Sequence, residues 1–173
     1  CLRGVATTDS LIDLYVLTET LAGVSSNALS RLGCRLAPPN VYYAECMHEG
    51  RTYRAKYAVL PRALFTSWMN RDNPYFWARF SQPAALVWTA DEIARTMVAK
   101  ACARAATTMF ANARALTDEK DPLAIWAAGF AATYATELRA ESAARARSVV
   151  DANPDYYREA ARRLAAVEPC PAI

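Results

Sequence analysis

Strand-forming and helix-forming segments occupy different halves of this sequence, and their separation constrains the fold more than any other feature. The runs that predict strands, rich in β-branched and aromatic residues, all lie before residue 90. From Asp91 onward the sequence is rich in alanine, the residue with the highest helix propensity. Strands followed by helices are typical of α+β domains. We therefore predict a small mixed sheet in residues 1–90 and a helical part, residues 91–173, packed on it.

Four runs predict strands. They are Ser10–Leu17, Val41–Cys46, Thr52–Leu60 and Ala84–Thr89. The first and the last are short apolar runs of the kind found in buried strands. The two middle runs are rich in aromatic residues, and the sequence that connects them contains the turn-forming Gly50. This connection favours an antiparallel hairpin.

Helices are predicted for most of the remaining chain. The predicted segments are Leu21–Leu36, Pro61–Met69, Asp91–Ala115, Pro122–Leu138, Ala140–Val150 and a last helix that begins near Asn153. Thr89–Glu92 is similar to a capping box, and Pro154 suits the first turn of a helix. The pattern of Tyr75–Phe80 does not decide between helix and strand. Its aromatic residues around Arg79 fit a core, an interface or a base-stacking surface.

The composition indicates that the cysteines are reduced. It predicts neither nucleic-acid binding nor a membrane-spanning helix. The net charge of +3 over 173 residues is too small to predict nucleic-acid binding. The five cysteines are scattered and form no CxxC pair or Cys/His cluster, so we expect a cytoplasmic compartment and neither zinc nor a disulfide framework. No apolar run approaches the ~20 residues that a membrane-spanning helix needs. The chain begins with Cys1 and shows no signal peptide, so whether residues precede it is left open.

Asp13 and Lys56 are the strongest chemical candidates. Asp13 interrupts an apolar strand, where a carboxylate needs a partner because burying it alone is costly. It either binds Mg²⁺, which prefers oxygen ligands, or forms a salt bridge with an arginine. Lys56 and Arg54 are two positions apart on a predicted strand and share a face, whereas Tyr57 lies on the other. Two cations on one strand face point either at solvent or into a phosphate site.

Other catalytic patterns have little support in the sequence. The residues two positions from Asp13 are Leu11 and Tyr15, so the paired acids of many metal-dependent nucleotidyltransferases are absent. His48 is the only histidine, and we interpret it as a solvated turn residue because no serine or cysteine can be paired with it. The sequence contains no GxGxxG motif and no Walker-type loop.

A series of short motifs extends over most of the chain. The series is Ile12–Leu14, Asn40–Tyr43, Gly50–Arg51, Lys56–Val59, Asn73–Tyr75, Arg79, Pro83, Ala128–Gly129, Tyr134, Glu137, Arg139, Asn153–Pro154 and Tyr157–Glu159. In order and approximate spacing it resembles the mitochondrial phosphatidate cytidylyltransferase family, the peripheral CDP-diacylglycerol synthases with a nucleotidyltransferase fold. Each motif is short, and the resemblance depends on the collinear series.

The resemblance implies an enzyme that uses Mg²⁺ to convert CTP and phosphatidic acid into CDP-diacylglycerol and pyrophosphate. Asp13 would hold the metal, and Lys56 would neutralise nucleotide or lipid phosphate. The further candidates for nucleotide or phosphate binding are Arg54, Tyr57, Arg79 and Arg139. The protein would work peripherally at the inner membrane, in contact with its lipids. A homodimer is left open.

The chain also departs from the family pattern. The glycine–serine turn that precedes the acidic strand in the family is not recognisable in Cys1–Asp9, and Ala58 stands where the family often has glycine. The family's Gly-Asp pair corresponds to Thr136-Glu137. The alternative function is therefore a non-catalytic nucleotide- or lipid-binding relative, or an accessory subunit, with the same fold.

Overall fold

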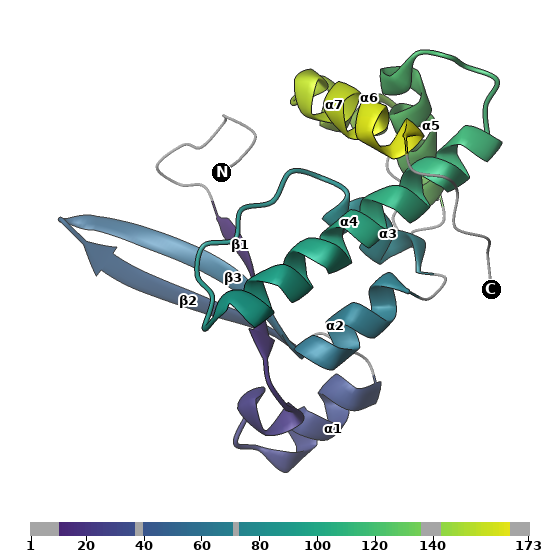
Figure 1. Cartoon of the computed structure of the whole chain (residues 1–173). Coiled ribbons are helices and arrows are strands. Elements are labelled where there is room, and N and C mark those ends of the chain that lie inside the picture. The colour runs from purple at the N-terminus through teal and green to yellow at the C-terminus, as the bar shows by residue number, and fades with distance from the viewer. Residues whose placement is uncertain (1–10, 37–39, 71–72, 136–142, 167–173) are drawn as a thin grey trace. The chain divides into compact units, whose positions relative to one another are not determined.

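The computed structural model describes residues 11–36, 40–70, 73–135 and 143–166 and confirms the α+β class (Figure 1). A three-stranded mixed sheet lies in the first half of the chain, and helices make up the second half. The chain divides into two compact units, residues 1–67 and 68–173. The boundary expected near residue 90 falls inside the second unit. Each unit is described separately below.

The sheet of the first unit combines one parallel and one antiparallel strand pair. Its strands are β1 (Ile12–Thr18), β2 (Asn40–His48) and β3 (Arg51–Pro61), in the order β1-β3-β2. β1 pairs with β3 in parallel, and β2 pairs with β3 as the expected antiparallel hairpin. Glu49 and Gly50 form the turn with φ angles of 50° and 72°, which suits a two-residue hairpin loop. β1 pairs only with Ala55–Pro61, so the hairpin extends past it (Figure 1).

Helical segments of the same unit contact one face of this sheet near the start of β2 and the end of β3. These segments are η1 (Leu21–Gly23) and α1 (Ala28–Leu36). A further helix, α2 (Arg62–Met69), follows β3 along the chain. The Tyr42 hydroxyl donates a hydrogen bond to the Val24 carbonyl at 3.4 Å. The Asn40 amide donates another to the Ser30 carbonyl at 2.8 Å. Because Asn40 and Tyr42 share a face of β2, η1 and α1 lie over that face.

The prediction that the first strand is buried is wrong. Ile12, Asp13 and Val16 are all exposed in β1. β1 is an edge strand, paired on one side only, and an apolar run does not distinguish such a strand from a central one. The carboxylate of Asp13 therefore does not bear the full cost of burial that its apolar neighbours implied.

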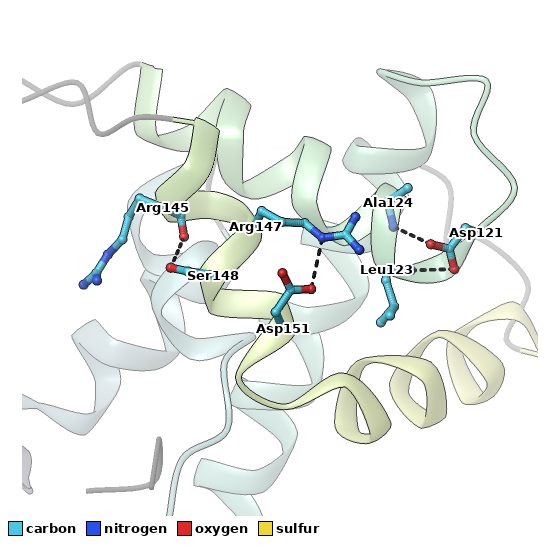
Figure 2. A network of polar contacts seen from close by, with 7 residues as sticks. All are labelled: Asp121, Leu123, Ala124, Arg145, Arg147, Ser148 and Asp151. Atoms are coloured by element: carbon cyan, nitrogen blue, oxygen red, sulfur yellow. Dashed lines mark hydrogen bonds and ion pairs between the residues drawn. The ribbon is translucent and has the colours of Figure 1, made fainter. Parts of the chain in front are cut away.

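The described residues of the second unit form helices from Glu92 onward, as the sequence predicted for the chain after Asp91. The helices after α2 are α3 (Pro74–Phe80), α4 (Glu92–Ala115), α5 (Pro122–Ala135), α6 (Ala143–Asp151) and α7 (Pro154–Ala165). Asp91 caps α4, where its side chain accepts a hydrogen bond from the Ala94 amide at 2.6 Å. Asp121 caps α5 by accepting from the amides of Leu123 and Ala124, as Figure 2 shows. No helix in the described part of the chain is long and apolar enough to cross a bilayer.

α6 carries its own surface contacts. Figure 2 shows the Arg147 guanidinium bound to the Asp151 carboxylate, with 3.0 Å between Nε and Oδ1. The Ser148 hydroxyl donates to the Arg145 carbonyl at 2.8 Å. These contacts lie within a single helix, at i, i+3 or i, i+4 spacing, and exposed pairs of this kind stabilise a helix only slightly.

The Tyr75–Phe80 segment, which the sequence left undecided, is helical. Asn73 caps α3 by accepting from the Phe76 amide at 3.3 Å, and Pro74 occupies the first turn. Phe76, Trp77 and Phe80 are buried, which favours the core interpretation of this aromatic cluster over an exposed base-stacking surface.

The strand predicted for Ala84–Thr89 is absent. Pro83–Thr89 has no regular secondary structure and links α3 to α4 as an irregular segment (Figure 1). Ala84–Trp88 is exposed throughout. The run has the composition of a buried strand, but burial also requires a partner strand, and a sequence pattern does not supply one.

Two helical glycines provide a test of packing in the two units. A Cβ at Gly129 in α5 would lie 2.7 Å from Cβ of Ala113 and 3.1 Å from Cε of Met109, both on α4. A Cβ at Gly33 in α1 would meet nothing within 4 Å. The same substitution should therefore have opposite effects at the two positions.

We expect Gly129→Ala to lower the free energy of unfolding by about 1–3 kcal/mol because it overpacks the α4–α5 contact. We expect Gly33→Ala to raise it by about 0.5–1 kcal/mol because alanine has the higher helix propensity. Urea unfolding of both variants beside the parent measures the difference. A Gly129→Ala protein as stable as Gly33→Ala would contradict the close approach of α4 and α5.

Candidate functional site

Asp13 and Lys56 lie directly opposite each other on neighbouring strands. The parallel register pairs Asp13 of β1 with Lys56 of β3, and the hairpin register pairs Lys56 with Tyr43 of β2. Residues paired across strands point to the same side of a sheet. Asp13, Lys56 and Tyr43 therefore form one row across all three strands, and all three are exposed. This row lies on the face opposite to the one that η1 and α1 contact.

A second row, formed by Arg54 and Glu45, lies beside the first. The two residues are paired in the hairpin, and Arg54 Nε lies 3.0 Å from Glu45 Oε1. The Tyr43 hydroxyl donates a hydrogen bond to the same carboxylate oxygen. Glu45 thus connects both rows and holds the Arg54 side chain toward β2. The predicted sharing of one strand face by Arg54 and Lys56 is confirmed by the register.

These contacts shift the acid–base properties of the exposed face. The hydrogen bonds from Tyr43 and Arg54 lower the pKa of the Glu45 carboxyl below its usual range, because they favour its ionised form. The same hydrogen bond to Glu45 raises the pKa of the Tyr43 phenol, because it favours the protonated hydroxyl. At neutral pH the face therefore carries an ionised Glu45 paired with Arg54 and a neutral Tyr43 beside Lys56.

Asp13 suits a magnesium ion only when other ligands complete the coordination shell of the metal. It offers one exposed carboxylate, and the described residues contain no group of three or more His, Cys, Asp or Glu side chains that could hold a metal by themselves. Mg²⁺ commonly binds to one or two carboxylates and completes its shell with water and substrate phosphate oxygens. A single carboxylate therefore suits a metal that arrives with a nucleotide better than a resident structural ion.

Tyr57, the remaining predicted site residue of β3, is not part of this row. Tyr57 lies on the opposite face of β3, where its ring stacks on Tyr42 with 5.5 Å between centroids. Arg79 is half-buried in α3 and belongs to the second unit. Arg139 lies outside the described residues. His48 is exposed at the end of β2, with 3.9 Å between its Nε2 and Glu49 Oε1.

Sequence reasoning missed Tyr43 and Glu45, although the hairpin contained the information needed to find them. A two-residue turn at Glu49-Gly50 makes His48 and Arg51 the first pair of the hairpin. Counting back from that pair places Glu45 opposite Arg54 and Tyr43 opposite Lys56. The pairing of Asp13 with Lys56 has no such local signal, because the two residues are 43 positions apart in the sequence.

Three of the five cysteines lie in the described residues. Cys34, Cys46 and Cys102 are free, and Cys34 is buried with its thiol 3.8 Å from the Val59 carbonyl oxygen.

No protein-family model matches the chain, and no curated protein matches it significantly.

Proposed function

We propose that this chain is a Mg²⁺-dependent cytidylyltransferase that transfers CMP from CTP to phosphatidic acid. The observation that carries the proposal is the pairing of Asp13 with Lys56 on an exposed sheet face, with Arg54 on the same face. A carboxylate beside two cations is a suitable set of groups for a metal-bound triphosphate. The collinear series of family-like motifs supports the same assignment.

In the proposed reaction, a phosphate oxygen of phosphatidic acid attacks the α-phosphorus of CTP. The new P–O bond forms as the bond from the α-phosphorus to the oxygen bridging the β-phosphate breaks. CDP-diacylglycerol and pyrophosphate are the products. Phosphoryl chemistry of this type depends mainly on positioning and charge neutralisation, so it does not require a histidine base or a nucleophilic side chain.

Asp13, Lys56 and Arg54 each have a specific task in this proposal. Asp13 would hold the Mg²⁺ ion, which would neutralise charge on the triphosphate. Lys56 would bind a phosphate of the nucleotide or of the acceptor lipid as a compact point charge. Arg54 would add a second phosphate contact, and its ion pair with Glu45 would restrict the positions that its guanidinium can take.

The test is a pyrophosphate-release assay with the full chain, CTP and phosphatidic acid. Phosphatidic acid should be presented both in detergent micelles and in vesicles, with Mg²⁺ and with a chelator in its place. We expect release only when CTP, phosphatidic acid and Mg²⁺ are all present, and little release when ATP or GTP replaces CTP. Mg²⁺-dependent CTP binding without release under any lipid presentation would support the alternative, a non-catalytic nucleotide-binding relative.

A further inference from the structure

The segment between α3 and α4 presents large apolar side chains to solvent. Val87 is 81% exposed and Trp88 is 78% exposed, and the adjoining Leu86 is also exposed. Ile93, in the first turn of α4, is 75% exposed. These four residues, Leu86, Val87, Trp88 and Ile93, are called the apolar segment below. Contiguous exposed apolar residues of this size mark binding surfaces in folded proteins.

The helix that follows the apolar segment, α4, carries a net positive charge. Between Ile93 and Ala115 the sequence contains no acidic residue, and its cations are Arg95, Lys100, Arg104 and Arg114. The one acid of the helix, Glu92, pairs with Arg95 at 3.1 Å. Ile93, Lys100 and Arg104 are spaced i, i+7 and i+11, so they lie along one side of the helix. Lys100 and Arg104 are both exposed.

We propose that the apolar segment, together with Lys100 and Arg104, binds the surface of an anionic lipid bilayer. Leu86, Val87 and Ile93 would enter the boundary between headgroups and acyl chains, where apolar side chains are favoured. Tryptophan favours the same boundary because its ring is apolar and its indole N–H is polar. Lys100 and Arg104 would contact lipid phosphates. The choice of a lipid partner rests on the proposed function, whose acceptor substrate lies in a bilayer.

Charge and side-chain type argue against two other occupants. In a symmetric dimer formed through this surface, the cations of one copy would lie near those of the other, with no acid of α4 beyond Glu92 to offset them. Single-stranded nucleic acid would need several aromatic platforms, but the segment offers Trp88 and otherwise aliphatic side chains. An anionic bilayer matches both the apolar and the cationic part of the surface.

The test is co-sedimentation of the full chain with vesicles of phosphatidylcholine, with and without phosphatidylglycerol. We expect binding that increases with phosphatidylglycerol and decreases with added salt. Val87→Glu/Trp88→Glu should reduce the bound fraction by roughly tenfold or more, because it removes the apolar insertion. Lys100→Glu/Arg104→Glu should remove the dependence on phosphatidylglycerol. The melting temperature and the circular dichroism of each variant should stay close to those of the parent.

The matched control uses a second exposed apolar stripe, on α1 in the described part of the first unit. Leu29 and Leu32 are exposed on α1 in the first unit, so Leu29→Glu/Leu32→Glu makes an equivalent change at a different surface. We expect this control to bind vesicles as the parent does. Loss of binding in the α1 variant with retention in Val87→Glu/Trp88→Glu would overturn the proposal. A parent dimer that Val87→Glu/Trp88→Glu converts to a monomer, in light scattering without lipid, would also overturn it.

Two measurements without bilayers separate this inference from the proposed function. CTP binding in the presence of Mg²⁺, and pyrophosphate release with a short-chain, dispersed phosphatidic acid, should be unchanged in Val87→Glu/Trp88→Glu. If the parent binds vesicles as expected but never binds CTP, the proposed function fails and the membrane surface stands. If CTP binding and turnover are present but the vesicle arms show no binding, the membrane surface fails alone.

Discussion

Trp126→Ala is expected to destabilise the chain by about 3–5 kcal/mol, the usual cost of removing a large aromatic side chain from a packed core. Trp126 lies in the second turn of α5 and is fully buried. Its ring centroid is 4.9 Å from that of Phe110 and 5.3 Å from that of Tyr157. Its indole Nε1 donates a hydrogen bond to the Tyr157 carbonyl at 3.1 Å. The substitution therefore opens a cavity between α4, α5 and α7 and removes the indole hydrogen bond to a buried carbonyl.

Thermal unfolding measures this effect. For a chain of 173 residues, 1 kcal/mol corresponds to a shift of about 2–4 °C in melting temperature, so a decrease of roughly 10 °C is expected. Trp88→Ala is the matched control, because it removes the same side chain from an exposed position. Its effect on the free energy of unfolding should stay within about 0.5 kcal/mol. Equal melting temperatures for the two variants would contradict the assignment of Trp126 to the core.

Much of the local structure could be predicted because its signals lie within a few residues of each other. The hairpin turn at Gly50, the helix start at Asp91 and the proline-led start of α7 at Pro154 each depend on short-range chemistry. The capping residue of α4 is Asp91 itself, one position before the helix, whereas the Thr89 hydroxyl bonds to the Asp91 carbonyl.

The features that sequence reasoning missed depend on long-range pairing. An apolar run such as Ala84–Thr89 has the composition of a strand, yet it forms one only where a neighbouring strand accepts its hydrogen bonds. The exposure of β1 depends on its place at the edge of the sheet. The opposition of Asp13 and Lys56 likewise depends on a parallel register between distant segments, and a shift of that register by one residue would place the two on opposite faces.

Loss of pyrophosphate release is the largest functional effect expected. Lys56→Met keeps the length and apolar stem of the side chain and removes its charge, so it tests phosphate neutralisation. We expect kcat/KM to decrease by roughly 10²–10³, the effect of removing one preorganised charge-stabilising group from an active site.

Asp13→Asn keeps the shape of the carboxylate but weakens metal binding. We expect a decrease of similar size in kcat/KM, together with loss of the Mg²⁺ dependence of CTP affinity.

The matched control lies on the same strand as Lys56. Arg51 of β3 is an exposed cation on the opposite face, because it is an odd number of residues from both Arg54 and Lys56. Arg51→Met should retain the activity of the parent, whereas Arg54→Met should lose part of it. If Lys56→Met and Arg51→Met lowered activity equally, general surface charge would explain the result and the Asp13–Lys56 row would not be the site. Unchanged Mg²⁺-dependent CTP binding in Asp13→Asn would exclude Asp13 as the metal ligand, because removing the carboxylate charge of a ligand must weaken the metal-dependent part of the binding.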